Sequence, residues 1–349
     1  MRIALATRHL ADSTSTQAVG GLGRALTERG HAVEVFTQSA PAGKARRAFR
    51  LPCRVLPARG LAERFSAALE RGGFDHVHLR VGGAHENPLL RGLRAFAQST
   101  RAAVSLQFDD FGNPDLPTES ARTAKALEEL FAARARVCAI SNAVRERVAR
   151  RWPRLRGRIA VIPTGIDPAP ANAATGRDVL CVGRLSPYKG LDLVLFASAG
   201  LSRGFRGKLV FAGYGTKDPY LARLAERLGL ADRVRLLGLV SHKEIRRLLA
   251  RSSFLVMGSR WEALGLSGLE AMAAGKPVIA PRLGGFLDYV EHGKNGLLFE
   301  PENPASLERA MRALVESPAR ARTLGRRARR TALRYAWPLI ARRYLALWK

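Results

Sequence analysis

The sequence predicts an α/β protein built from two doubly wound parallel sheets. Short apolar runs, typical of buried parallel strands, alternate along the chain with segments of helical periodicity. A polar segment rich in Pro, Ala and Gly, residues 168–177, interrupts this alternation, which then starts again. The 349 residues are enough for two ordinary domains. We therefore expect domains at 1–167 and 168–335, followed by a terminal helix at 336–349.

The first series opens with a strand (2–7), a polar loop (9–23), a helix (22–29) and a second strand (31–37), which is how a doubly wound sheet begins. The loop ends in Gly20, Gly21 and Gly23, whose spacing does not fit the G-x-G-x-x-G pattern of dinucleotide-binding loops. A tight turn between strand and helix is the plainer interpretation of these glycines, and a ligand-binding loop is the alternative.

Two aspartates mark the end of a buried strand in the first half. Further strands are expected at 76–82, 102–108, 136–141 and 159–167, with helices at 87–98, 119–135 and 142–152. Asp109 and Asp110 directly follow the strand 102–108. Open α/β sheets bind ligands at the C-terminal ends of their parallel strands. These aspartates are therefore candidate ligand-binding residues, with a helix N-cap as the alternative role.

The second series contains two glutamates, Glu262 and Glu270, with seven residues between them. We expect Glu262 in a loop after a strand at 253–259, and Glu270 near the start of a helix at 266–274 that Gly275 ends. A helix N-terminus offers N–H groups and a partial positive charge to a phosphate. A carboxylate one turn further in can accept hydrogen bonds from sugar hydroxyls.

Other candidate residues lie at or just after the C-terminal ends of the strands 178–185, 208–215 and 234–240: Arg184, Lys189, Gly213–Gly215 and Val240. The C-terminal ends of parallel strands meet at one edge of a sheet, so these residues and the two glutamates would line one pocket. Two cations and helix N–H groups bind a diphosphate, while carboxylates bind hydroxyls. The sequence therefore predicts a sugar-nucleotide site.

The chain carries a formal net charge of +29, and no Asp or Glu follows Glu316. Such a charge indicates an anionic partner or an arginine-rich proteome. The basic segment 42–71 contains an amphipathic stretch, 61–71, which either lies on anionic lipid or is an ordinary solvated helix. The three cysteines lie far apart without disulfide or zinc spacing, which favours a reducing compartment. No apolar run approaches the length of a transmembrane helix.

Four stretches of the second half resemble the retaining GT-B glycosyltransferases of family 4, the "glycosyl transferases group 1": VGRLSPYKGLDLVL, FAGYG, VRLLGLVSHKEI and SRWEALGLSGLEAMAAGKPVIAPRLGGFLDYVEHGKNGLLF. In the first half, VGGLGRALTERGHAVEVFT, VCAISNAVRE and VIPTGID are similar to the same family. The resemblance implies two Rossmann-like domains facing a central cleft. The first would lie on the acceptor side and the second would bind the nucleotide sugar, with the terminal helix crossing back to the first.

The resemblance also implies roles for individual residues. Arg184 and Lys189 would bind the donor diphosphate, Glu270 the ribose hydroxyls and Glu262 the transferred sugar. The full donor-binding set implied by the resemblance is Gly21, Arg184, Lys189, Gly213, Val240, Glu262, Gly265, Leu266 and Glu270.

The chain departs from the family at the end of the strand 102–108. The family often has a His-Asp pair there, whereas this chain has Gln107, Phe108 and Asp109. The usual histidine that contacts the sugar is thus missing, and Asp109 or Gln107 is the candidate substitute. The implied catalytic set is Glu262, Arg184, Lys189 and Asp109.

The implied reaction moves a sugar, with retention, from a donor of the UDP or GDP type to an acceptor. The basic region 44–64 and the terminal arginines favour an anionic acceptor, such as a lipid-linked or lipopolysaccharide-type glycan. We expect a monomeric cytoplasmic enzyme that works at the inner face of the cytoplasmic membrane. No metal or other cofactor is expected, because two cations already face the diphosphate. The alternatives are a GT-B sugar-nucleotide epimerase and a basic nucleic-acid-binding protein, although no nucleic-acid-binding module is recognisable.

Overall fold

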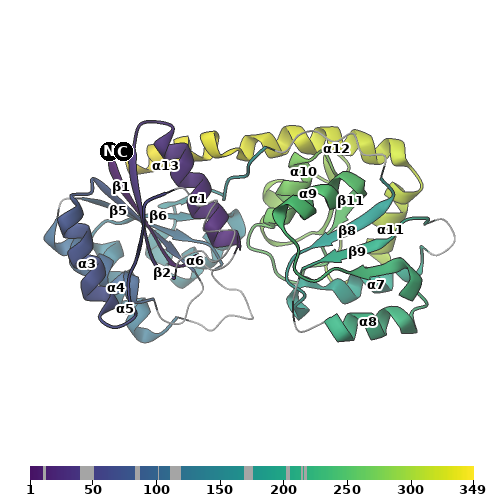
Figure 1. The fold of residues 1–349 in the computed structure, drawn as a ribbon, viewed down its shortest axis with the longest axis horizontal. Helices are drawn as coiled ribbons and strands as arrows, with labels where there is room; N and C mark the ends of the chain where they lie inside the picture. The colour runs from purple at the N-terminus through teal and green to yellow at the C-terminus, as the bar shows by residue number, and fades with distance from the viewer. Residues whose placement is uncertain are drawn as a thin grey trace. The chain divides into compact units, whose positions relative to one another are not determined.

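The computed structural model describes residues 1–10, 13–39, 51–82, 87–100, 102–110, 119–168, 176–201, 205–213, 215 and 218–349. These residues form two compact units (Figure 1). Unit 1 comprises Met1–Gly165 and Trp337–Lys349, and unit 2 comprises Ile166–Ala336. Each unit contains one sheet in which all paired strands are parallel, which confirms the predicted α/β class.

The sheet of unit 1 has the strand order β3-β2-β1-β4-β5-β6-β7. Its strands are β1 (Arg2–His9), β2 (Ala32–Ser39), β3 (Cys53–Val55), β4 (His76–Val81), β5 (Ala103–Phe108), β6 (Arg136–Ala139) and β7 (Ile159–Val161). Its helices are α1 (Ser13–Thr27), α3 (Leu61–Gly72), α4 (Pro88–Ser99), α5 (Ala121–Ala132), α6 (Asn142–Arg151) and α13 (Trp337–Trp348), with a short 3-10 turn η1 (Pro153–Leu155).

The sheet of unit 2 has the order β10-β9-β8-β11-β12-β13. Its strands are β8 (Asp178–Val182), β9 (Leu209–Ala212), β10 (Val234–Leu236), β11 (Ser252–Val256), β12 (Val278–Pro281) and β13 (Gly296–Phe299). Its helices are α7 (Leu191–Ala199), α8 (Asp218–Arg227), α9 (His242–Arg251), α10 (Leu266–Ala273), α11 (Pro304–Val315) and α12 (Pro318–Ala332). The described part of this unit also contains the 3-10 turns η2 (Pro187–Lys189), η3 (Ala231–Arg233), η4 (Gly284–Asp288) and η5 (Leu333–Tyr335).

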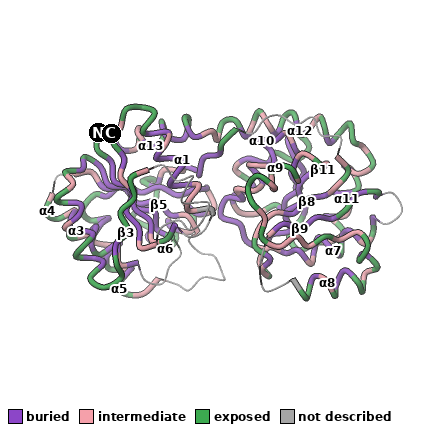
Figure 2. Tube along the Cα trace, viewed as in Figure 1, coloured by how far each residue is buried: buried purple, intermediate pink, exposed green. Residues whose placement is uncertain are grey.

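Helices cover both faces of each sheet, so the central strands are buried along their length (Figure 2). In unit 1, α3, α4 and α5 pack in a row, while α1 packs against α13 (Figure 1). In unit 2, α7 packs against α8 and α11, while α10 packs against α12. Strands buried on both faces are expected to be continuous apolar runs, which is why the sequence pattern located them.

The terminal helix crosses back to unit 1, as predicted. Trp337, Ile340 and Tyr344 of α13 belong to the same buried cluster as Ile3 and Leu5 of β1. The chain therefore leaves unit 1 after residue 165 and returns to it at residue 337. Residues 169–175 of the predicted hinge lie outside the described residues.

The predicted loop at 9–23 is wrong over most of its length, because α1 begins at Ser13 and contains all three glycines. A Cβ atom on Gly21 would lie 2.0 Å from the Trp337 ring, and one on Gly23 would lie 2.2 Å from Leu51. These glycines therefore let a helix pack closely against α13 and Leu51 and do not form a turn.

The amphipathic stretch 61–71 forms α3, and its apolar side is used inside unit 1. Phe65 and Leu69 are fully buried there, and the carbonyl of Ala62 packs against Gly92 of α4. The interpretation of this stretch as an element lying on lipid is therefore wrong, and the ordinary helix is what forms. Residues 40–50 of the basic segment lie outside the described residues.

Candidate functional site

The candidate site of unit 2 lies where the direction of strand order reverses. β8 sits in the middle of the order, between β9 and β11. The chain leaves β8 and β11 toward opposite sides of the sheet, which leaves a crevice at their C-terminal ends where α/β proteins bind ligands. The loops after these two strands carry Arg184, Lys189 and Glu262.

The loop after β8 contains one position, Gly190, that requires glycine. It passes through η2 and enters α7 at Gly190, which has a φ of +55°. A Cβ atom on Gly190 would lie 2.0 Å from the carbonyl oxygen of Gly258, in the loop after β11. The two loops are therefore in backbone contact, which brings Lys189 next to the segment that carries Glu262.

Lys189 and Glu262 form an ion pair, with 2.6 Å between Nζ and Oε2. Both side chains are mostly buried, with 17% and 11% of their surface exposed. The Ser259 hydroxyl also donates to Glu262, at 3.4 Å. The structure thus joins two predicted site residues that are 73 positions apart in the sequence. A carboxylate held this way fixes the position of the ammonium group, whose three protons allow it to serve more than one acceptor.

Arg184 lies exposed beside this pair, at the mouth of a small hollow. The hollow is lined by Gly183, Arg184 and Lys189 from the loop after β8, and by Met257 and Ser259 from the loop after β11. Both predicted cations therefore face one depression in the surface of unit 2.

The N-terminus of α10 lies at the same edge of the sheet. Its N-cap, Gly265, has a φ of +82°, and Tyr289 donates a hydrogen bond from its hydroxyl to the Gly265 carbonyl at 2.9 Å. Burial, followed by the charge of Glu262, raises the pKa of Tyr289 well above its usual value, so this donor keeps its proton. Ser267 in the first turn donates to the carbonyl of Val182, at the end of β8, at 3.1 Å. The helix start is thus tied to the loop that carries Arg184.

Leu266 and Glu270 are both partly exposed on α10. Leu266 is the first residue of the helix, so its N–H has no acceptor within the helix. Glu270 stands one turn further in, as the sequence predicts. Gly213 and Val240 complete the predicted set: the Gly213 N–H donates to the carbonyl of Gly238 at 2.9 Å, which places the loop that bears Val240 beside the end of β9.

Arg260 is a residue that sequence reasoning missed. Its guanidinium makes two parallel hydrogen bonds to the Asp192 carboxylate of α7, at 3.0 and 2.9 Å, and a third to the Pro187 carbonyl, at 2.7 Å. Its Nε atom bonds Glu302 at 2.9 Å, and its backbone N–H donates to Tyr188 at 2.7 Å. Arg260 therefore clamps the turn η2 to the loop after β11. No sequence spacing signals this pairing, because Asp192 lies 68 residues away.

The predicted candidates at the end of β5 in unit 1 have different surroundings in the structure. Asp109 lies at the strand end and forms an ion pair with Arg80, with 2.8 Å between Nε and Oδ2. Phe108 is fully buried against Phe131 and Trp152. Asp109 therefore keeps its place as a candidate, and Phe108 is part of the core.

Gln107 is wrong as the substitute for the missing histidine. It is 2% exposed, and its side-chain oxygen accepts hydrogen bonds from the Tyr344 hydroxyl and from the His78 ring, the latter at 3.2 Å. Its side chain is thus used to hold α13. Gly21, the other predicted donor contact in unit 1, lies inside α1 against Trp337 instead of in a loop.

Two family models match the chain, one after the other. The model "Glycosyltransferase Family 4" matches residues 16–170, and "Glycosyl transferases group 1" matches residues 166–331. The chain belongs to glycosyltransferase family 4. The second model covers every candidate residue in unit 2, and the first covers Gly21 and Asp109.

Curated proteins similar to this member of family 4 share part of their length with it. A D-inositol 3-phosphate glycosyltransferase of Streptomyces avermitilis is 31% identical over 290 residues, which are 76% of this chain and 61% of the relative. A glycogen synthase of Mycobacterium tuberculosis is 34% identical over 191 residues, which are 52% of this chain and 46% of the relative. The chain thus matches about half to three fifths of the length of these relatives.

Solved structures confirm the GT-B fold of the chain. A glycosyltransferase from Rickettsia africae superposes with a TM-score of 0.82 at 18% identity, covering 100% of this chain and 97% of the other. HepE from Anabaena, solved in complex with UDP-glucose, superposes with a TM-score of 0.81 at 21% identity, covering 99% and 98%. The epimerase alternative is not favoured, since these relatives and neighbours are glycosyltransferases or synthases.

Proposed function

We propose that the protein transfers a sugar from a nucleoside diphosphate sugar to an acceptor, and that unit 2 binds the donor. The observation that carries this proposal is the Lys189–Glu262 ion pair at the C-terminal ends of β8 and β11, with Arg184 beside it. Cations, a helix N-terminus and carboxylates gathered at one sheet edge suit a diphosphate with a sugar on either side. The match to a glycosyltransferase family and the UDP-glucose complex of a structural neighbour support it.

In the proposed mechanism, the residues of unit 2 act on the leaving group. Arg184 and Lys189 stabilise the negative charge that grows on the diphosphate as the sugar–phosphate bond breaks. Glu270 accepts hydrogen bonds from the ribose hydroxyls, and Glu262 contacts the transferred sugar while it holds Lys189. The N–H groups of Gly265 and Leu266 face the phosphate or the sugar, and the backbone near Val240 meets the base.

We further propose that the anomeric configuration is retained. Retaining glycosidases use two carboxylates about 5 Å apart, one of them as nucleophile. Family 4 enzymes do not show such a pair, so front-face attack by the acceptor hydroxyl is the proposed route. An ion-pair-like transition state forms, and the leaving diphosphate takes the proton of the acceptor. Two cations already face the diphosphate in this scheme, so no metal ion is required. Asp109 of unit 1 is the proposed acceptor-side carboxylate.

Replacing Glu270 with alanine is expected to weaken donor binding tenfold or more, because a hydrogen bond to a charged group contributes roughly 1.5–3 kcal/mol. The measurement is titration calorimetry with UDP and GDP, each with and without the sugar, after a thermal-shift screen has shown which base stabilises the wild type. Glu300→Ala is the matched control, since Glu300 is an exposed carboxylate of the same unit. Equal affinity in Glu270→Ala and Glu300→Ala would reject the ribose assignment.

The acceptor that we propose is an anionic lipid-linked or cell-envelope glycan, reached by a cytoplasmic protein at the inner face of the membrane. The support is the excess of arginine, which favours negatively charged surfaces. Among the described residues, the structure has no helix that is long and apolar enough to cross a bilayer. With a radiolabelled donor and a membrane extract, label is expected to enter the fraction soluble in organic solvent. Label confined to the aqueous fraction would contradict a lipid-linked acceptor.

A further inference from the structure

The outer side of α12 and η5 carries six exposed arginines, which we call the α12 arginine face: Arg320, Arg322, Arg326, Arg327, Arg330 and Arg334. None of the six forms an ion pair with another described residue. Elsewhere in unit 2, exposed arginines such as Arg282 and Arg312 do have carboxylate partners. Since no acidic residue follows Glu316, the helix itself offers these arginines no partner.

The spacing of these arginines works against the helix. Arg322, Arg326 and Arg330 follow one another on α12 at intervals of four residues, so their side chains form a row along one side, and Arg334 follows in η5. The row on α12 is about 12 Å long, at 1.5 Å per residue. Like charges at this interval destabilise a helix. A row of anions placed along the helix would offset the repulsion between the arginines. A neutral surface cannot provide this stabilisation.

The other side of α12 is fully used inside unit 2. Its buried residues are Ala321, Leu324, Gly325, Ala328 and Ala332. A Cβ atom on Gly325 would lie 2.1 Å from the carbonyl oxygen of Gly275, just after α10. The helix α12 therefore has no apolar side left to insert into a bilayer. Leu333 of η5 is an exposed apolar side chain beside the arginines, so the α12 arginine face acts mainly through charge at a surface.

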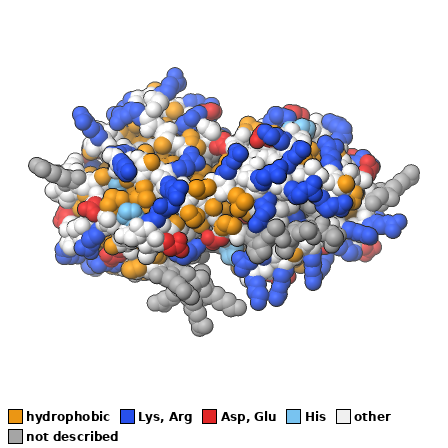
Figure 3. All heavy atoms as spheres, turned by 90° about the horizontal axis from the view of Figure 1, so that it is seen from above, with side chains coloured by type: hydrophobic (Ala, Val, Ile, Leu, Met, Phe, Trp, Pro, Cys, Tyr) orange, Lys and Arg blue, Asp and Glu red, His pale blue; other side chains and the backbone are white. Residues whose placement is uncertain are grey.

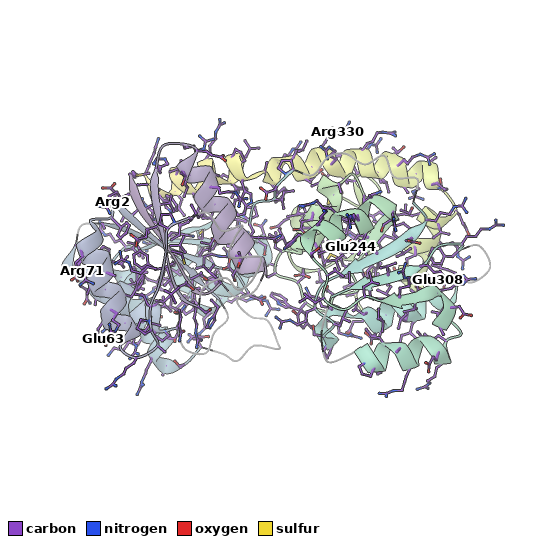
Figure 4. The ribbon with its side chains drawn as sticks, viewed as in Figure 1. Arg2, Glu63, Arg71, Glu244, Glu308 and Arg330 are labelled. Atoms are coloured by element: carbon purple, nitrogen blue, oxygen red, sulfur yellow. The ribbon has the colours of Figure 1, made fainter. Side chains whose placement is uncertain are left out.

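The α12 arginine face is open to its surroundings. Figure 4 shows Arg330 on the outer side of α12, directed away from the sheet. Figure 3 looks onto the side of the molecule that carries α12 and shows Lys and Arg side chains gathered over this part of unit 2. No aromatic side chain is exposed on the described part of this face, because Trp337 is buried and the Tyr335 hydroxyl is bonded to the carbonyl of Asp288. Single-stranded nucleic acids need such stacking platforms, whereas lipid headgroups do not.

We propose that the α12 arginine face docks unit 2 on a bilayer surface that contains anionic phospholipid. An array of headgroup phosphates can meet arginines that all lie on the outer side of the helix, and each arginine near such a surface contributes to binding. The attachment is mainly electrostatic, so it weakens steeply as salt rises. The proposal rests on the membrane location proposed above and names the surface that makes the contact, but it does not depend on the donor site.

The test compares two triple variants that each remove three positive charges from unit 2. Arg322→Ala/Arg326→Ala/Arg330→Ala removes the row on α12. Arg223→Ala/Arg227→Ala/Arg235→Ala removes three other exposed arginines. Two of them lie on α8, on the opposite side of the sheet from α12 (Figure 1), and the third lies in the edge strand β10. The wild type and both variants are mixed with phosphatidylcholine vesicles that do or do not contain phosphatidylglycerol. The salt concentration is about 0.1 M, at which charges act over roughly 10 Å. Flotation measures the bound fraction, and thermal unfolding checks that both variants fold.

The wild type and the α8/β10 variant are expected to float with the anionic vesicles and not with the neutral ones. The α12 variant is expected to lose affinity on the order of a hundredfold, since each arginine near an anionic surface contributes about 1 kcal/mol. Equal losses of vesicle affinity in both triple variants would show that net charge alone causes binding and would overturn the proposal. Wild type that does not bind the anionic vesicles would overturn it as well. Binding to an RNA or DNA duplex that requires the α12 arginines, under salt conditions where vesicles do not bind, would overturn it in favour of a nucleic-acid surface. No donor or acceptor enters this measurement, so its outcome is separate from that of the transfer assay.

Discussion

Lys189→Ala is expected to lower the turnover of sugar transfer by a factor of about 100 to 1000, the effect of removing one preorganised contact to charge that develops in a transition state. Lys189 is suited to this role because Glu262 holds its ammonium group at 2.6 Å while Arg184 stands beside it at the same hollow. The loss should fall on kcat more than on KM, because charge on the diphosphate grows mainly as the bond to the sugar breaks. The measurement is nucleoside diphosphate release with the donor that binds in calorimetry.

Two controls separate this effect from loss of structure. Arg282→Ala removes an exposed cation that is also paired with a glutamate, Glu300, and should leave kcat unchanged. Lys189→Ala should still unfold in one cooperative transition, at a lowered temperature because the mostly buried Glu262 carboxylate loses its cation, and turnover is measured well below that transition. Because Lys189 and Arg184 supply the positive charge, activity is also expected to continue in EDTA. Full activity of Lys189→Ala would reject the proposed role, and a strict need for added Mn²⁺ would reject the metal-free scheme.

Unit 1 is expected to lose about 4 kcal/mol of stability between pH 7.5 and pH 5, because two histidines are buried there as neutral rings. Burial, then the charges of His78 and Arg136, lowers the pKa of His76 to about 2. Burial is also the largest cause for His78, whose pKa falls to about 3; Arg80 lowers it further, while the bond to Gln107 opposes the shift. In the unfolded chain both histidines take up a proton near their ordinary pKa of 6.5, whereas in the folded chain they stay neutral. The stabilisation is therefore complete above that pH and is lost as the pH falls.

The prediction can be checked by thermal unfolding at several pH values, with loss of α13 as the expected early event. The His76 ring stacks on Trp348 at 4.4 Å, and the His78 ring lies 5.0 Å from that of Tyr344, so both histidines lie under this helix. His76→Phe removes one of the two titrating rings and should roughly halve the pH dependence. His31→Asn, at a partly exposed position, should change the dependence less than His76→Phe does. A melting temperature that is the same at pH 7.5 and pH 5 would contradict the assignment.

The sheet edges could be predicted from the sequence because parallel strands are visible as apolar runs, and the loops after them gather at one edge. That logic located Glu262 and Lys189, and the structure brings the two side chains into contact. It failed for Gly20, Gly21 and Gly23, because glycine is typical of turns and the reason for Gly21 here is a tryptophan more than 300 residues away. It also failed for Gln107, which stands near the end of a strand in the sequence but is covered by Tyr344 of α13 in the structure.

The pairing of Arg260 with Asp192 limits which substitutions are tolerated at these two positions. Arg260 and Asp192 are 31% and 22% exposed, and each neutralises the other through two hydrogen bonds. Losing one of them leaves a half-buried charge on the other and loosens the turn that holds Lys189. Changes at these two positions are therefore tolerated together far better than singly. Glu302, the third member, is 65% exposed and can vary on its own. The two loops of the site are thus expected to change together, although 68 residues of chain separate the residues that join them.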